Sequence, residues 1–186
     1  MQKRRVFIAI NLSGDIKKKL AEFQKKRSEL PVRWTKSENL HITLDFLGYL
    51  RDEELLEVSK TVKEVALKHT PFEIKLTKIC YGPTDKKPPR MIWALGERSE
   101  EFSVLKENLD KILGVSESRV FSPHITLGRL RQWEWRRIEP EERPVVDEEI
   151  NLSFLVESIE VMESVLKKAG VEYAILESLP LDGSKT

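Results

Sequence analysis

Residues 41–44 read His-Ile-Thr-Leu, and the same tetrapeptide returns at residues 124–127. Alternate residues of a β-strand leave the same face, so each copy presents a histidine and a threonine together, opposite its isoleucine and leucine. The two polar pairs are His41 with Thr43 and His124 with Thr126, and they use two of the three histidines in the chain. If the two strands face each other, two imidazoles and two hydroxyls converge on one point.

Three amphipathic helices and several short strands are predicted around the two motifs. Apolar residues recur at helical spacing over residues 16–30, 52–68 and 99–113. Ser13 is the best cap for the first helix, Pro31 is expected to end it, and Gly114 suits the C-terminus of the third. Strands are expected at 5–11, 32–35, 40–47, 72–81, 91–95, 122–130, 150–156, 159–165 and 171–179.

This order of elements predicts an α+β protein with antiparallel sheets, because helices and strands do not alternate as a continuous βαβ series. The two copies of the motif lie 83 residues apart, which suggests two similar lobes related by a pseudo-two-fold axis. Their flanks barely resemble each other, so internal duplication is an inference from the motif alone. We expect residues 1–186 to form a single bilobal domain.

The composition is typical of a water-soluble globular protein, with 40% apolar residues, 34% charged residues and a net charge of +1. No apolar run approaches the ~20 residues that span a bilayer, and the N-terminal segment lacks a signal-peptide core. The single cysteine, Cys80, excludes an internal disulfide and fits a reducing compartment. We therefore expect a cytoplasmic protein without membrane contact. The net charge also argues against a dedicated duplex-DNA binder.

A pair of histidines suits displacement at a phosphodiester. Histidine titrates near a pKa of about 6.5, so a neutral imidazole can accept a proton from the nucleophile while a protonated one donates to the leaving oxygen. The threonine hydroxyls beside them can hold non-bridging oxygens. His69 follows a predicted helix, where a cation favours the helix dipole, and is left out of the site. A zinc site needs three or four ligands, so no metal and no other cofactor is expected.

These motifs and their flanks resemble the 2H phosphoesterase superfamily, which is defined by paired His-x-Thr-x motifs. Within it, the chain is most similar to the LigT-like RNA 2′,3′-cyclic phosphodiesterases, also called 2′-5′ RNA ligases. The resemblance covers essentially the whole chain, and its supporting stretches are residues 5–10, 39–48, 90–93 and 121–129. It implies a bilobal α+β fold, with two antiparallel sheets and outer helices around a central cleft, and no metal.

By resemblance, two further residues are expected at the site. The family places an arginine three residues after the second threonine on the phosphate, here Arg129, and an aromatic residue after the first threonine against the base, here Phe46. Strict alternation would turn both side chains to the opposite face of their strands. Arg129 can reach the site only if its strand ends or twists at Gly128. For Phe46 two interpretations stay open, a platform for the base and a core residue.

The resemblance implies hydrolysis of RNA ending in a 2′,3′-cyclic phosphate to a 2′-phosphomonoester. It assigns His124 as the base that activates water and His41 as the acid, roles that the nearly symmetric motifs do not distinguish. Expected substrates are RNA ends, tRNA fragments among them, or nucleotides, and the expected state is a monomer. Two alternatives stay open: 2′-5′ ligation to a 5′-hydroxyl RNA end, and a noncatalytic RNA- or nucleotide-binding protein of the same fold.

Other basic and aromatic residues are weaker candidates for contact with RNA. Lys86, Lys87 and Arg90 can form a basic rim for the RNA backbone, although solvated loop charges would look the same in a sequence. Trp133 and Trp135 stand among arginines, where they can stack on bases or pack the lobes together.

Overall fold

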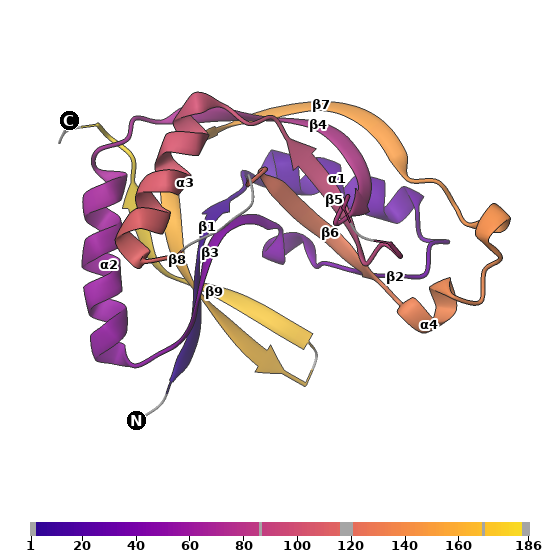
Figure 1. Cartoon of the computed structure of the whole chain (residues 1–186), viewed down its shortest axis with the longest axis horizontal. Helices are drawn as coiled ribbons and strands as arrows, with labels where there is room; N and C mark the ends of the chain where they lie inside the picture. Colours follow the sequence, from indigo (N-terminus) through magenta and orange to yellow (C-terminus); the bar gives the residue numbers. More distant parts are fainter. Residues whose placement is uncertain (1–2, 86, 116–120, 169, 184–186) are drawn as a thin grey trace.

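The computed structural model describes residues 3–85, 87–115, 121–168 and 170–183, and in this part of the chain nine strands form one antiparallel sheet (Figure 1). The strands are β1 (Arg4–Asn11), β2 (Val32–Trp34), β3 (His41–Leu50), β4 (Phe72–Gly82), β5 (Met91–Gly96), β6 (His124–Leu130), β7 (Asp147–Val156), β8 (Ser158–Lys167) and β9 (Gly170–Pro180). The helices are α1 (Gly14–Lys26), α2 (Asp52–Ala66), α3 (Glu100–Leu113) and the short α4 (Gln132–Trp135), with 3-10 turns η1 (Ser37–Asn39) and η2 (Pro140–Glu142). The predicted α+β class with antiparallel strands is confirmed.

The sheet has two halves that meet at the motif strands. Its order is β7-β4-β5-β6-β3-β1-β8-β9, with β2 paired to β6. The junction between β3 and β6 is one residue pair, Ile42 opposite Ile125, whereas the other neighbouring strands pair over longer stretches. The two sheets expected from the sequence are therefore two halves of a single sheet, joined only where the two motifs meet.

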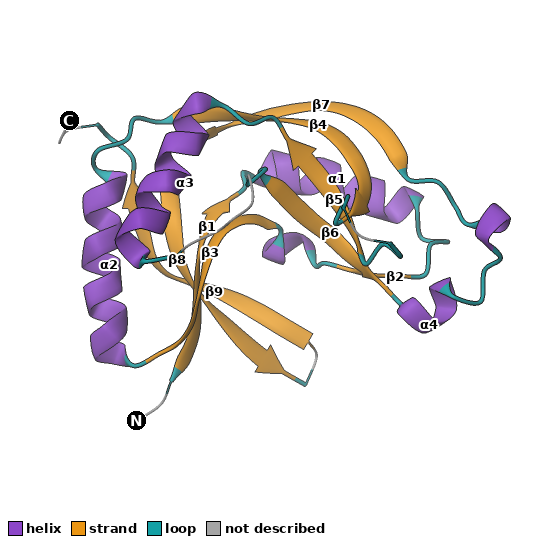
Figure 2. Cartoon of the chain, viewed as in Figure 1, coloured by secondary structure: helices purple, strands orange, loops and turns teal. Residues whose placement is uncertain are grey.

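One face of the sheet is covered by helices. Leu20 of α1, Val62 of α2 and Leu105 of α3 are buried in the same core as Ile42 and Ile125, so one core extends under both halves. Figure 2 shows α2 and α3 side by side on one half, while α1 lies behind β5 and β6. The other face carries a separate small cluster of Phe7, Ala9 and Met162, with Tyr173 packed against it.

The helix boundaries follow local signals with one exception. The Ser13 hydroxyl accepts a hydrogen bond from the Ile16 N–H at 3.5 Å, and Gly114 ends α3 with a positive φ of 66°. The helix α1 ends at Lys26, so the prediction that it continues to Pro31 was wrong. Backbone turns replace the helix there, with the Arg27 N–H bonded to the Gln24 carbonyl and the Leu30 N–H bonded to the Arg27 carbonyl. No helix in the described part of the chain is long and apolar enough to cross a membrane.

Candidate active site

The two motifs lie side by side at the junction of the sheet. Ile42 and Ile125 face each other there and are both buried in the core under the helices. One step along this antiparallel register, the histidine of each motif stands across from the threonine of the other. Residues that face each other across a strand pair project to the same side. The four polar side chains therefore share the face that the helices leave uncovered, as the alternation of the tetrapeptide predicts.

Backbone carbonyls orient both imidazoles in the same way. The Nδ1–H of His41 donates to the Asn39 carbonyl at 2.6 Å, and the Nδ1–H of His124 donates to the Ser122 carbonyl at 2.9 Å. Because a carbonyl oxygen can only accept, Nδ1 carries the proton in each neutral ring, and Nε2 is the nitrogen that titrates. Nε2 of His41 also lies 2.9 Å from the Thr43 hydroxyl. Each ring thus keeps one nitrogen for proton transfer.

Aromatic rings pack against both histidines, a feature that the sequence interpretation missed. The rings of Phe7 and Tyr173 lie 5.1 Å and 5.0 Å from the imidazole of His41. Trp93 stacks on His124 with ring centroids 4.0 Å apart. Its pairing with a motif threonine on β6 places it on the site face, and this pairing is the signal that could have identified it.

Burial lowers the pKa of both catalytic candidates. The largest cause of the lowered pKa of His41 is desolvation, to which the charges of Lys17 and His124 add, while its carbonyl partner opposes the shift. Desolvation also lowers the pKa of His124, again against a carbonyl partner. Both imidazoles are therefore neutral near pH 7 in the free protein. An anionic phosphate between them would favour the protonated form and restore one cation.

A β-bulge places Arg129 on the site face. Along β5 and β6, Trp93 pairs with Thr126 but Met91 pairs with Arg129, so β6 carries one extra residue, Leu127, between the two pairs. Met91 and Trp93 share one face of β5, and Arg129 therefore lies on the same face as Thr126. Its guanidinium approaches the Met91 sulfur at 3.6 Å. The sequence predicts that this strand ends or twists at Gly128, and the structure has a bulge one residue earlier, at Leu127.

A matching bulge places Phe46 on the same face as the first motif. On β1, Ala9 pairs with Thr43 and Phe7 with Phe46, so Leu44 is the extra residue of β3. The ring of Phe46 lies 6.1 Å from that of Phe7 and remains 71% exposed. This exposure excludes the core interpretation of Phe46. In each motif the leucine, Leu44 or Leu127, is therefore the bulge residue. Because of this bulge, the third residue after the motif threonine lies on the site face.

Buried polar groups behind the sheet support both bulges. The carbonyl of Leu127 accepts hydrogen bonds from the Thr35 N–H and from Nε2 of the buried Gln24, each at 2.8 Å. Next to the other bulge, the buried Asp45 accepts from Nζ of Lys106 at 3.2 Å. Because of its burial, the pKa of Asp45 is raised to about 6 although Lys106 opposes the shift.

The remaining candidates divide between packing and surface. Trp135 is buried against Tyr81, with ring centroids 5.2 Å apart, so it packs the fold. Trp133 is 61% exposed, and Arg137 lies 4.7 Å from its ring. Nε2 of His69 accepts from Asn108 at 3.1 Å. Lys86 lies outside the described residues, and among those described no three His, Cys, Asp or Glu side chains are grouped to hold a metal ion.

Comparison with known proteins gives the class. A family model described as LigT like Phosphoesterase matches residues 10–93, which include the first motif. A solved structure from Thermus thermophilus superposes with a TM-score of 0.79 at 30% identity, covering 95% of this chain and 97% of that one. Escherichia coli LigT complexed with 3′-AMP also superposes at 0.79, at 22% identity, and covers 97% and 99% of the two chains. The fold of this chain is therefore that of the LigT structure, and its first motif lies in the segment that the LigT-like phosphoesterase model matches.

Curated relatives narrow the class further. The RNA 2′,3′-cyclic phosphodiesterase of Thermus thermophilus is 31% identical over 96% of this chain and 91% of its own length. The protein of the same name from Aquifex aeolicus is 28% identical over 96% and 98% of the two chains. The chain belongs to the family of RNA 2′,3′-cyclic phosphodiesterases.

Proposed function

We propose that this protein hydrolyses the 2′,3′-cyclic phosphate at the end of an RNA to a 2′-phosphomonoester. The observation that carries the proposal is the pair of imidazoles on one face, each held through Nδ1 by a carbonyl two residues before it. This arrangement leaves two Nε2 atoms, on neighbouring strands, for the two proton transfers of a phosphodiester hydrolysis. The membership of the family supports the choice of a cyclic RNA end as substrate.

The two histidines would divide the proton transfers. Nε2 of His124 removes a proton from water as the water oxygen attacks phosphorus, and Nε2–H of His41 protonates the 3′-oxygen as the P–O3′ bond breaks. His124 then holds the proton that His41 has lost, and exchange with solvent restores both rings. Within the described residues the Nε2 atom of His124 has no hydrogen-bond partner, which suits the group that binds water. His41, whose Nε2 lies against the Thr43 hydroxyl, is the acid.

The remaining site residues would bind the phosphate and the base. The hydroxyls of Thr43 and Thr126 face the same side as the imidazoles and would hold the non-bridging oxygens as charge builds on them. Arg129, brought to this face by its bulge, supplies a positive charge. The exposed ring of Phe46 is available to stack on the nucleobase.

The rate should depend on pH as a bell-shaped curve centred below pH 6.5. The productive state needs one neutral and one protonated imidazole, and the pKa values of both fall below the ordinary 6.5 in the free protein. Since kcat/KM reports the free enzyme, its maximum lies below 6.5, and the bound phosphate shifts the maximum of kcat upward. A pH series of initial rates measures both, and a curve that rises monotonically through pH 9 would point to a different base.

The principal test of the function uses an end-labelled RNA with a 2′,3′-cyclic phosphate, incubated in EDTA with and without a 5′-hydroxyl RNA. We expect mostly 2′-phosphate product, because water is far more abundant than an RNA end and only strong positioning offsets that difference. Mostly joined 2′-5′ RNA would make ligation the principal activity. An unchanged cyclic phosphate would favour a noncatalytic binding protein. Rescue by added zinc or manganese would indicate a metal-dependent hydrolase.

The biological setting follows from the same proposal. We infer a monomeric, single bilobal domain that acts in the cytoplasm on RNA fragments, tRNA fragments among them. One core shared by both halves of the sheet supports the single domain. The structure of Escherichia coli LigT, a protein of the same fold, was solved in complex with 3′-AMP, which supports a nucleotide as a ligand of this protein.

A further inference from the structure

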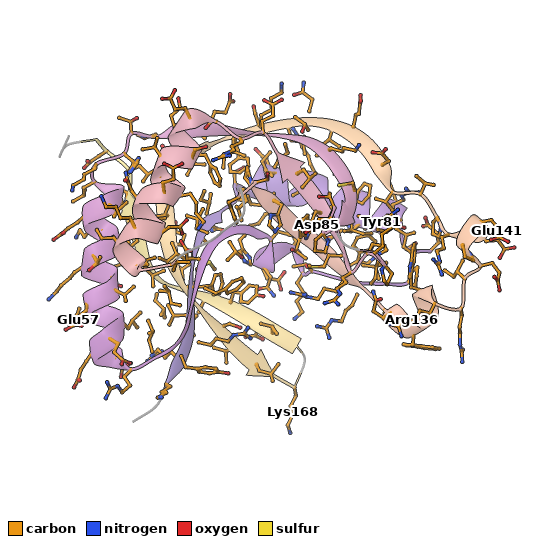
Figure 3. All side chains as sticks on the ribbon, in the orientation of Figure 1. Glu57, Tyr81, Asp85, Arg136, Glu141 and Lys168 are labelled. Atoms are coloured by element: carbon orange, nitrogen blue, oxygen red, sulfur yellow. The ribbon has the colours of Figure 1, made fainter. Side chains whose placement is uncertain are left out.

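A basic pocket adjoins the site at the far end of β6. Its volume is about 630 Å³, and its lining includes Lys87, Arg90, Arg129 and Arg136 against one carboxylate, that of Asp85. Figure 3 labels Asp85 and Arg136 in the half of the molecule that carries α4. The whole chain has a net charge of only +1, so this concentration of cations is local. It favours a ligand with more than one negative charge.

A second observation points to an anion at the same place. Arg33 of β2 stands directly opposite Arg129 of β6 in the sheet, so two guanidinium groups share one face. Like charges at directly opposed positions destabilise a strand pair unless an anion lies between or beside them. Among the described residues, neither arginine forms an ion pair. The two arginines therefore repel each other in the free protein, and a phosphate bound beside them would offset this repulsion.

Most of the pocket lies beyond Arg129, on the side of β6 that points away from the motifs. Arg129 follows His124 by five residues, and a strand of that length extends about 15 Å. Arg129 borders both places, whereas Arg90 and Arg136 line only the pocket. A cyclic mononucleotide has one phosphate, and the histidines would hold it. An RNA strand that continues from the cyclic end has further phosphates at a distance suited to this pocket.

An aromatic side chain stands beside the cations. Gln132 of α4 and Arg136, the residue that follows α4, line the pocket. Trp133, between them in sequence, is exposed, and Arg137 lies over its ring. Proteins that bind single-stranded nucleic acid combine such cations with exposed rings on which bases stack. The chemistry of this surface therefore fits single-stranded RNA better than it fits a free phosphate ion.

We propose that this pocket binds backbone phosphate of the RNA upstream of the cyclic end, and so gives the enzyme a preference for oligoribonucleotides over cyclic mononucleotides. The inference rests on the proposed function for its catalytic readout. Arg90 and Arg136 provide the main contacts, with Arg33 and Lys87 adding to the local field. The backbone of Arg90 pairs with Gly82 and Leu130 independently of its side chain, so a substitution there keeps the sheet intact.

The test compares kcat/KM for a short oligoribonucleotide and for a mononucleotide, both with a 2′,3′-cyclic phosphate. The preference is the ratio of kcat/KM for the oligoribonucleotide to kcat/KM for the mononucleotide. In the R90Q/R136Q variant this ratio should be at least tenfold smaller than in the wild type. The slope of log kcat/KM for the oligoribonucleotide against log salt concentration should become shallower by about 0.7 for each phosphate contact that the variant loses. The matched control is R98Q, an exposed arginine at the opposite end of β5, and should keep the preference.

A binding measurement separates this proposal from the proposed function. Fluorescence anisotropy with a labelled oligoribonucleotide ending in a 2′-phosphate reports the pocket without any reaction. We expect at least tenfold weaker binding to R90Q/R136Q than to the wild type or to R98Q. If the wild type hydrolyses neither substrate, the proposed hydrolytic function is wrong. The binding measurement still tests whether the pocket binds RNA phosphate. Equal affinity of wild type and R90Q/R136Q, or a wild type with no preference between the two substrates, overturns the pocket proposal.

Discussion

Alanine in place of His41 or His124 is expected to lower kcat/KM on a 2′,3′-cyclic phosphate by at least ~100-fold. Each substitution removes one of the two Nε2 atoms that transfer protons, and His69, the third histidine, contacts Asn108 instead. The two effects should not add, because acid and base act as a unit. The double substitution should therefore cost about as much as the more damaging single one. Initial rates with a cyclic-ended oligoribonucleotide measure all three variants.

Two further substitutions separate loss of chemistry from loss of structure. In H41N and H124N, the amide N–H of asparagine can still donate to the carbonyl that held Nδ1, while the titratable nitrogen is gone. They should be as inactive as the alanine variants and melt close to the wild type. H69A is the matched control, since His69 contacts Asn108 away from the motifs, and it should keep its activity. Activity near the wild-type level in either asparagine variant would remove that histidine from the mechanism.

Methionine in place of Lys106 is expected to lower the free energy of unfolding by about 3–5 kcal/mol, because it leaves a buried carboxylate without its cation. The side chains of Lys106 and Asp45 are only 4% and 2% exposed, and Lys106 also pairs with Asp110 one turn along α3. Its Nζ lies 5.1 Å from the centre of the Phe121 ring as well. Urea denaturation at pH 7.5 measures the loss.

The pH dependence of this loss identifies Asp45 as its source. In the folded protein the pKa of Asp45 is about 6, against an ordinary 3.8, so the folded state binds the proton more tightly and stability falls as pH rises from 3.8 to 6. Without Lys106 this pKa rises further. The loss in the free energy of unfolding of K106M should therefore be smaller at pH 5 than at pH 7.5. The double variant K106M/D45N should recover part of this loss.

The control for this prediction is on the same helix. Lys111 of α3 is exposed, and K111M should change stability by no more than about 0.5 kcal/mol. A deficit of K106M below about 1 kcal/mol at pH 7.5 would mean that Asp45 is accommodated without its partner. A deficit of equal size at both pH values would assign the loss to packing instead.

Residues that depend only on their own segment could be predicted from the sequence. The grouping of His41 with Thr43 requires only that a strand alternates, and Ser13 and Gly114 act within single turns of helix. Lys106 shows where this kind of reasoning stops. It belongs to a helix whose polar residues were expected to face water, but the fold places Asp45 of a distant strand beside it. Charge partners separated by many residues leave no periodic signal.

The sequence by itself determined that two His-x-Thr pairs would lie on strands with their polar side chains on one face, and that amphipathic helices would cover the other. Only the tertiary structure decided that Arg129 and Phe46 join that face and that Arg33 stands against Arg129. The physical reason is that a bulge is a property of two strands. A residue is extra in one strand only by comparison with the strand that pairs with it. The sequence of one segment does not show which strand it pairs with, or in which register.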